Sequence, residues 1–273
     1  MASTYVTSNH PQGSITRVAA IYDIHGNFPA LEAVLRDIEK VNPDAILVGG
    51  DLASGPLPRE TLERLMTLGA HVHVIRGNAD RELVDCFDRS SDAAAEGVED
   101  DIWILRDKWA ARQITREQRD FLASLPEAKV FDIQGVGPVL FCHGSPRNDE
   151  EIITARTPDT RLRLILAGVE ESLVVCGHTH MQFDRILDRM RVVNAGSVGM
   201  PYEPEPGAYW ALLGPDVTLR RTVYDFNEAT EQIRRTRFPG ADDHVAHLFS
   251  ELPSREEVIR FFEKLAKERE EGG

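Results

Sequence analysis

The stretch I-T-R-V-A-A-I-Y-D (15–23) decides the fold, because a nearly continuous apolar segment rich in β-branched residues ends at an aspartate. Buried strands of parallel sheets have this composition. Pro29 then opens a segment whose apolar residues recur with a period near 3.6, which predicts a helix directly after the strand. The apolar positions of this helix are Leu31, Val34, Leu35, Ile38 and Val41.

The same strand–helix unit continues along the chain. A second strand, A-I-L-V (45–48), leads to Asp51, and a third, H-V-H-V-I (71–75), leads to Asn78. A helix that begins at Pro58 separates these two strands. Because strands and helices alternate, we expect neighbouring strands to be parallel. Their polar end residues should meet at the carboxyl edge, where open α/β sheets bind ligands.

The middle of the chain is less regular. The acidic stretch 88–101 predicts an exposed loop, and a capping box of Thr115 and Gln118 predicts a helix that ends near Pro126. Strand patterns then return with few helices between them, which predicts a second sheet packed on the first. These strands are K-V-F-D-I (129–133), P-V-L-F-C-H (138–143), L-V-V-C-G-H (173–178), R-V-V-N (191–194) and Y-W-A-L-L (209–213).

The two ends of the chain lie outside this pattern. Residues 1–14 are expected to form a disordered tail, followed by one domain over 15–240. In the C-terminal extension, 241–273, Ser254 and Glu257 form a capping box that predicts a helix. We expect this helix to pack on the domain; a contact in an oligomer is the alternative. Its apolar stripe consists of Val258, Phe261, Phe262 and Leu265.

Composition restricts the classes of function. The 273 residues carry a net charge of −14, which argues against a DNA-coating surface, so nucleic acid enters only as a small nucleotide substrate. No apolar run approaches the roughly 18 residues that span a bilayer, and the N-terminus has no apolar signal-peptide core. The 3 cysteines are too few and too scattered for a disulfide framework. We therefore expect a cytoplasmic protein without a membrane partner; the sequence leaves its oligomeric state open.

Side chains of the types that bind metal ions gather at the predicted strand ends. Each has an ordinary explanation as a turn, a helix cap or a structural histidine, but independent turns would not recruit four histidines to one edge. Such a set suits two divalent cations that together hold a phosphoryl group. Imidazole and carboxylate ligands favour Mn, Fe or Zn over Mg or Ca, and we expect Mn. The residues are Asp23, His25, Asp51, Asn78, His143, His178 and His180.

Six short motifs contain these residues. They are D-I-H-G-N (23–27), G-G-D-L-A-S-G-P (49–56), G-N-A-D (77–80), C-H-G-S-P (142–146), G-H-T-H (177–180) and N-A-G-S-V-G (194–199). In order and spacing, from residue 18 to about 225, they resemble the successive blocks of the calcineurin-like metallophosphoesterases. The resemblance is greatest to small bacterial and archaeal phosphoesterases with a G-N-C-D block.

The resemblance implies a fold, a reaction and a role for each ligand. The fold would be a four-layer α/β/β/α sandwich of two mixed sheets flanked by helices, making 15–240 a metallophosphoesterase domain. A metal-bridging hydroxide would attack the phosphorus of a phosphate ester. The motifs place Asp23, His25 and His180 on the first metal, Asn78, His143 and His178 on the second, and Asp51 between them.

Three further residues bear on the reaction. Arg76 stands where related protein phosphatases clamp phosphate, although a solvated arginine at a strand end is the simpler explanation; Asn27 is a second candidate substrate contact. Many members of the family have a histidine general acid where this chain has Ala79, whose methyl group cannot donate a proton. This absence favours a phosphodiesterase, or a substrate with an acidic leaving group.

Two other functions stay open. The R-G-N block shared with protein phosphatases is consistent with a phosphomonoesterase that acts on phosphoproteins or small phosphates. Relatives without activity serve as protein-binding scaffolds, usually with eroded ligands, whereas all seven are intact here. The segments 88–113 and 145–160 are the expected specificity loops and carry no motif that identifies a substrate.

Overall fold

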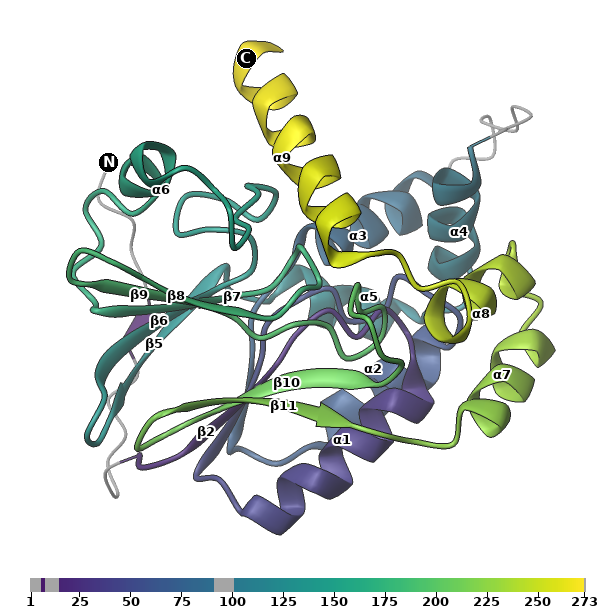
Figure 1. Ribbon diagram of the computed structural model, residues 1–273. Helices are drawn as coiled ribbons and strands as arrows, with labels where there is room; N and C mark the ends of the chain where they lie inside the picture. The colour runs from purple at the N-terminus through teal and green to yellow at the C-terminus, as the bar shows by residue number, and fades with distance from the viewer. Residues whose placement is uncertain (1–5, 8–14, 91–100, 273) are drawn as a thin grey trace.

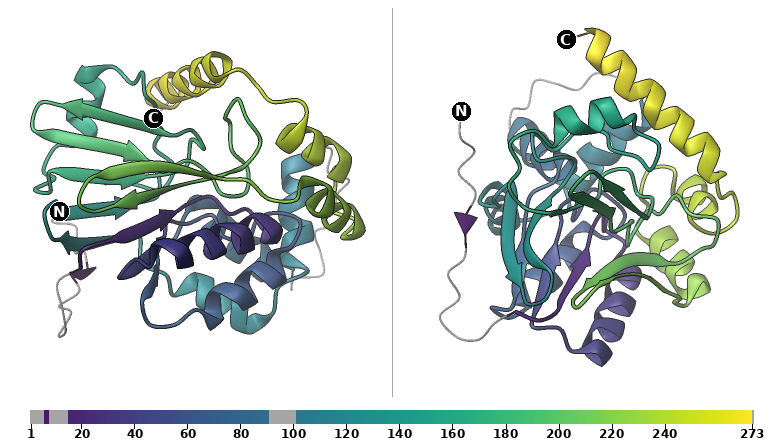
Figure 2. Two further views of the ribbon diagram at one scale, coloured as in Figure 1. Left: turned by 60° about the horizontal axis from the view of Figure 1, so that its bottom comes forward. Right: turned by 60° about the vertical axis from the view of Figure 1, so that its left-hand side comes forward.

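The predicted four-layer α/β/β/α sandwich is confirmed (Figure 1). The structure, a computed structural model, describes residues 6–7, 15–90 and 101–272. Within these ranges, a five-stranded and a six-stranded mixed sheet pack face to face, and helices cover the outer face of each sheet (Figure 2).

The five-stranded sheet contains the strand–helix repeat found in the sequence. Its strands run in the order β11-β10-β2-β3-β4. Strands β2, β3 and β4 are parallel to one another, as predicted, whereas β10 is antiparallel to β2 and β11 is antiparallel to β10. The strands are β2 (Val18–Ile21), β3 (Ala45–Val48), β4 (Val72–Val74), β10 (Ala208–Leu213) and β11 (Val217–Thr222).

The six-stranded sheet is built from the second half of the chain, with one short addition. Its order is β1-β5-β6-β7-β9-β8, and β6, β7 and β9 are parallel to one another. The two-residue strand β1 falls within the predicted tail and pairs with β5; the rest of that tail lies outside the described residues. The strands are β1 (Val6–Thr7), β5 (Ala128–Ile133), β6 (Gly137–Cys142), β7 (Leu173–Cys176), β8 (Phe183–Leu187) and β9 (Met190–Asn194).

The helices divide between the two outer faces. Over the five-stranded sheet lie α1 (Phe28–Val41), α2 (Pro58–Thr67), α3 (Asn78–Ser90), α4 (Ile102–Ala111) and α5 (Arg116–Ala123). The six-stranded sheet is covered by α6 (Asp159–Ile165). The chain ends in α7 (Phe226–Arg235), α8 (Ala241–Phe249) and α9 (Arg255–Gly272).

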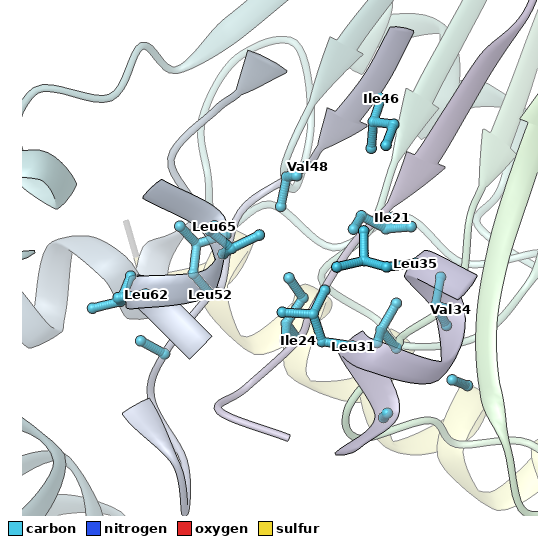
Figure 3. Packing of buried hydrophobic residues seen from close by; sticks show 14 of the residues in the cluster. Ile21, Ile24, Leu31, Val34, Leu35, Ile46, Val48, Leu52, Leu62 and Leu65 are labelled. Carbon is cyan, nitrogen blue, oxygen red and sulfur yellow. The ribbon is translucent and has the colours of Figure 1, made fainter. Parts of the chain in front are cut away.

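Side chains along β2 point alternately into two different hydrophobic cores. Ala19 and Ile21 face α1 and α2, while Val18, Ala20 and Tyr22 face the other sheet. Figure 3 shows the first core, where apolar side chains of both helices meet those of β2 and β3. Because each face of the strand is buried, its sequence is apolar at every position, which is why 15–23 identifies the fold.

One predicted loop is partly helical. Residues 88–90 belong to α3, and 102–111, assigned to a specificity loop by the sequence, form α4. The side chain of Asp101 caps α4 by accepting a hydrogen bond from the Trp103 N–H. The acidic segment 91–100 lies outside the described residues. Within the part of the chain that is described, no helix combines the length and apolar character needed to cross a membrane.

The C-terminal helix α9 packs on the domain through a face slightly different from the predicted stripe. Val258 and Ile259 are buried against Met181, and Phe262 packs beside them. Phe261 instead is 62% exposed, so its place in the stripe was wrong. The predicted capping box forms, with Ser254 and Glu257 bonded to each other's backbone N–H.

Glu263 makes the main polar contact between α9 and the domain. Its carboxylate accepts hydrogen bonds from the hydroxyls of Thr154 and Thr157 and from the guanidinium of Arg161. We expect Glu263→Ala to lower the free energy of unfolding by about 1–3 kcal/mol, because these donors lose their acceptor. Lys264→Ala, an exposed neighbour on the same helix, should change it by less than about 0.5 kcal/mol in urea unfolding. Equal stability of the two variants would show that α9 is not held by this contact.

Candidate metal centre

The seven predicted ligands lie where strands of the two sheets end together. Asp23 follows β2, Asp51 follows β3, and Asn78 begins α3 just after β4. His143 follows β6, and the pair His178 and His180 follows β7. Both sheets therefore present their carboxyl ends to one place, as parallel strand topology predicts.

Six of these residues form two overlapping groups of ligand atoms. Within each group, the nitrogen and oxygen atoms all lie within 4.8 Å of one another, and Asp51 belongs to both groups. Asn78 joins the second group, because its Oδ1 lies 3.2 Å from Nε2 of His143. The groups are Asp23, His25, Asp51 and His180, and Asp51, His143 and His178.

Backbone carbonyls fix the tautomers of three of the histidines. Nδ1 of His25 lies 3.3 Å from the Ser54 carbonyl, and Nδ1 of His180 lies 2.7 Å from the Met200 carbonyl. Nδ1 of His143 lies 2.8 Å from the carbonyl of Gly49. An Nδ1–H that donates to a carbonyl leaves Nε2 as the lone-pair nitrogen of a neutral imidazole, which is the arrangement of metal-binding histidines.

The chemistry of these donors fits a bound cation. Nε2 of His25 and Nε2 of His180 are only 3.0 Å apart, and in the neutral tautomers neither carries a proton to donate to the other. Oδ1 of Asp23 is buried without a hydrogen-bond partner and lies 3.5 Å from Nε2 of His180. Buried polar atoms are normally paired, so crowded, unpaired donor atoms point to a missing positive charge.

The Asp51 carboxylate divides its two oxygens between the backbone and the histidines. Oδ1 accepts a hydrogen bond of 2.8 Å from the Ala79 N–H. Oδ2 lies 3.6 Å from Nε2 of His25 and 3.3 Å from Nε2 of His143. One carboxylate oxygen thus faces both groups.

Burial and mutual charge shift the pKa values in this cluster. Burial alone would raise the pKa of Asp51, but His143 and His25 outweigh it and hold the value well below the usual range. Burial would lower the pKa of His143, but Asp51 and Asp23 raise it to about 10. Burial, with His143 nearby, lowers the pKa of His178 to about 4. The buried carboxylates therefore favour positive charge at this point of the structure.

Five of the ligands adopt an uncommon backbone conformation. A non-glycine residue at positive φ costs about 1–3 kcal/mol and persists only where the surroundings impose it. Such residues cluster at functional sites, where the strain positions a side chain. Here they are Asp23 (φ 53°), His25 (φ 45°), Asp51 (φ 54°), His178 (φ 65°) and His180 (φ 57°).

A buried carboxylate beside the ligands holds the Asp51 loop. Asp80 accepts hydrogen bonds from the N–H groups of Asp51, Leu52 and Gly77. Burial and the charge of Asp51 raise the pKa of Asp80, and the N–H groups oppose this rise. Gly77 must be glycine, because an added Cβ would lie 2.1 Å from Oδ1 of Asp51. The G-N-A-D motif therefore positions Asp51 as well as supplying Asn78.

The N-A-G-S-V-G motif supports the loop that carries His178 and His180. Asn194 donates hydrogen bonds to the Gly177 carbonyl and to the Thr179 hydroxyl. The hydroxyl of Ser197 donates to the Asp23 carbonyl and accepts from the Met200 N–H. Met200 in turn supplies the carbonyl at Nδ1 of His180. The sequence identified this motif but did not predict its supporting role.

The two predicted substrate contacts both have partners within the protein. The Arg76 guanidinium pairs with Glu127 at 2.8 Å, so its role as a phosphate clamp stays a prediction that requires this pair to open. Asn27 is fully buried; its amide caps α1 at the Ala30 N–H and donates to the Gly199 carbonyl and the Tyr224 hydroxyl. All its polar atoms are paired within the protein, so the geometry does not support the predicted substrate contact.

Sequence reasoning missed residues that reach the cluster from distant segments. The Tyr202 ring stacks on His180 with centroids 5.1 Å apart, and the ring of His247 from α8 makes an edge contact with Tyr202 at a centroid distance of 5.3 Å. Ser54, whose carbonyl faces His25, donates its hydroxyl to Asp107 of α4. None of these residues belongs to a motif, and no local pattern indicates that α4 and α8 meet near the strand ends.

Comparisons with known proteins agree with this geometry. The family model for the calcineurin-like phosphoesterase superfamily domain matches residues 17–214. The crystal structure of hypothetical protein PH1004 from Pyrococcus horikoshii has a TM-score of 0.73 at 25% identity, covering 85% of this chain and 97% of that one. The crystal structure of a metallophosphoesterase from Sphaerobacter thermophilus has a TM-score of 0.65 at 26% identity. The match covers 86% of this chain and 98% of that one.

A sequence relative extends the similarity to another archaeon. The uncharacterized protein MJ0912 of Methanocaldococcus jannaschii is 29% identical over 247 residues, covering 81% of this chain and 93% of the relative. The family model spans both sheets except β1 and β11, and it includes all seven residues of the cluster. The chain therefore belongs to the calcineurin-like phosphoesterase superfamily and is a metal-dependent phosphoester hydrolase.

Proposed function

We propose that this protein is a dinuclear phosphodiesterase. Asp23, His25 and His180 would hold one divalent ion, and Asn78, His143 and His178 the other. The observation that carries this proposal is the position of Asp51, whose Oδ2 faces a histidine of each group. A single oxygen in that position suits two cations about 3.5–4 Å apart.

The bound ions would act as Lewis acids on the phosphoryl oxygens and lower the pKa of water in the site. The protein contributes position and charge. The carbonyls of Ser54, Met200 and Gly49 keep Nε2 of three histidines directed at the centre, and the Ala79 N–H keeps one oxygen of Asp51 away from it. Manganese is our choice of metal because the donor set combines imidazole, carboxylate and amide groups.

The leaving group distinguishes diesters from monoesters in this proposal. Ala79 lies at the start of α3, where its N–H contacts Asp51 and its methyl group is buried. The methyl group cannot protonate a departing oxygen, and general acid catalysis contributes about 10²–10⁴-fold in enzymes that use it. Esters whose leaving groups are acidic, among them activated diesters, depend least on that proton.

The dinuclear site predicts a joint loss of metal and activity on changing Asp51. Asp51→Asn removes the charge that both groups share while preserving the side chain's shape. We expect bound manganese to fall from two ions per chain to one or none, with a decrease in kcat of about 100-fold or more. Elemental analysis after dialysis and hydrolysis of bis(p-nitrophenyl) phosphate measure the two effects.

The matched control is Asp85→Asn, which removes an exposed carboxylate on α3. It should retain metal and activity. An Asp51→Asn enzyme that keeps two manganese ions and full activity would contradict the bridging role.

The missing general acid predicts a steep dependence on the leaving group. In the wild-type enzyme, kcat/KM for diesters should fall sharply as the pKa of the leaving alcohol rises, because nothing protonates it. Ala79→His restores an imidazole at this position. It should raise the rate on alkyl leaving groups by about 10-fold or more and leave p-nitrophenyl esters nearly unchanged.

Ala79→Asn controls for polarity at the same position, because an amide does not donate a proton at neutral pH. A series of substituted phenyl and alkyl diesters gives the slope for each variant. If the wild-type enzyme cleaves alkyl and aryl diesters equally fast, another side chain supplies the proton and the role given to Ala79 is wrong.

A further inference from the structure

Arg106 of α4 is a half-buried cation whose position is fixed by neutral groups. Its Nε donates to the Pro239 carbonyl at 3.1 Å, and its Nη2 donates to the Gly240 carbonyl at 3.3 Å. The guanidinium lies over the rings of Trp103 and Phe238, at 5.0 and 5.2 Å from their centroids. Among the residues that the structure describes, no carboxylate forms an ion pair with it. Buried arginines are normally paired with acids; the carboxylates of Asp243 and Asp107 lie near enough to favour the charge of Arg106 without forming an ion pair with it.

Two histidines of α8 lie beside Arg106 and also lack partners. His244 is only 5% exposed, and its ring contacts Phe238 at 5.4 Å. Within the described residues, Nε2 of His244 and Nε2 of His247 are both buried without a hydrogen-bond partner. Burial, with Arg106 nearby, lowers the pKa of His244 to about 3, so this imidazole is neutral at physiological pH. Unpaired buried nitrogens beside an unpaired cation make a site suited to an anion.

This group of residues borders the metal centre on its first-metal side. His247 contacts Tyr202, and Tyr202 stacks on the ligand His180. Asp107, the neighbour of Arg106, accepts a hydrogen bond from Ser54, whose carbonyl holds the ligand His25. Two separate chains of contacts therefore join α4 and α8 to the centre.

We propose that Arg106, His244 and His247 bind a second anionic group of the substrate, so that the preferred substrate is a phosphodiester carrying a further phosphate. This inference rests on the proposed phosphodiesterase function. Arg106 supplies the charge, and the imidazole nitrogens supply hydrogen bonds. In a chain with a net charge of −14, a cation without an ion pair is a specific feature rather than part of a general positive surface.

The anion bound here is a different group from the one that reacts. Tyr202 contacts both His247 and His180, with centroid distances of 5.3 and 5.1 Å. In this proposal the phosphoryl group held at the ligands and the anion at the α8 histidines are two separate groups. A second phosphate a few bonds away in the same molecule can reach the α8 histidines, as in a nucleoside with phosphates on two of its sugar hydroxyls.

Two esters with the same leaving group test the proposal. One is the p-nitrophenyl ester of thymidine 5′-phosphate, and the other is the same ester with an added 3′-phosphate. For the manganese-loaded wild-type enzyme, we expect kcat/KM to be about 10-fold or more higher for the 3′-phosphorylated ester, mainly through KM, because a charged hydrogen bond adds binding. In Arg106→Met this ratio should fall to about 1, and Arg106→Lys should keep part of it.

Arg112→Met is the matched control, since Arg112 is an exposed arginine at the C-terminal end of the same helix. It should keep the wild-type ratio. Calorimetric binding of thymidine 3′,5′-bisphosphate and thymidine 5′-phosphate gives a readout independent of turnover. The bisphosphate should bind about 10-fold more tightly to the wild-type protein and lose this advantage in Arg106→Met.

A ratio near 1 in the wild-type enzyme overturns the inference, whether or not Arg106→Met folds. An unchanged ratio in a folded Arg106→Met enzyme overturns it as well. If neither ester is cleaved, the proposed phosphodiesterase function fails instead, and the calorimetric comparison still tests the second anion site.

Discussion

The site depends on an unfavourable contact between two nitrogen atoms. Nε2 of His25 and Nε2 of His180 lie 3.0 Å apart, and carbonyls at both Nδ1 atoms keep their lone pairs directed at each other. The contact between these two nitrogen atoms is not stabilising by itself, so the rest of the fold must impose it. It does so partly with positive-φ backbone at five ligands, each costing about 1–3 kcal/mol against a net stability of about 5–15 kcal/mol for a whole domain. A cation at this point would relieve the repulsion, which couples metal binding to folding.

The G-N-A-D motif shows how one short segment can serve the centre in several ways. Asn78 supplies a ligand oxygen, Gly77 leaves room for the Asp51 carboxylate, and Asp80 binds the backbone of that loop. Ala79 contributes its N–H to Asp51. Three of these functions concern Asp51 rather than substrate, so the residue at position 79 can vary without loss of the metal centre.

The sequence predicted those helices and strands that are determined by the pattern of their own residues. Buried parallel strands have apolar residues throughout, and their carboxyl ends meet at one edge, so the positions of Asp23, Asp51 and His143 followed from pattern alone. Asn27 was predicted as a substrate contact from its place in a motif, whereas the contact that the structure shows is the cap of α1 by its amide oxygen. Helix α4 was missed because four adjacent apolar residues at its start, 102–105, are partly exposed and show no helical period. Contacts between α4 and residues 238–240, just before α8, join positions more than a hundred residues apart, and no motif marks them.

The C-terminal extension contributes to the surroundings of the candidate metal centre. The family model ends at residue 214, and it contains every metal ligand but neither histidine of α8. The C-terminal extension nevertheless reaches the centre. Pro239 and Gly240 hold Arg106 through their carbonyls, and Arg255 of α9 pairs with Glu203, beside Tyr202. Glu203 also accepts a hydrogen bond from Gln182, two residues after His180. The docked extension therefore contacts the groups that border the candidate ligand His180.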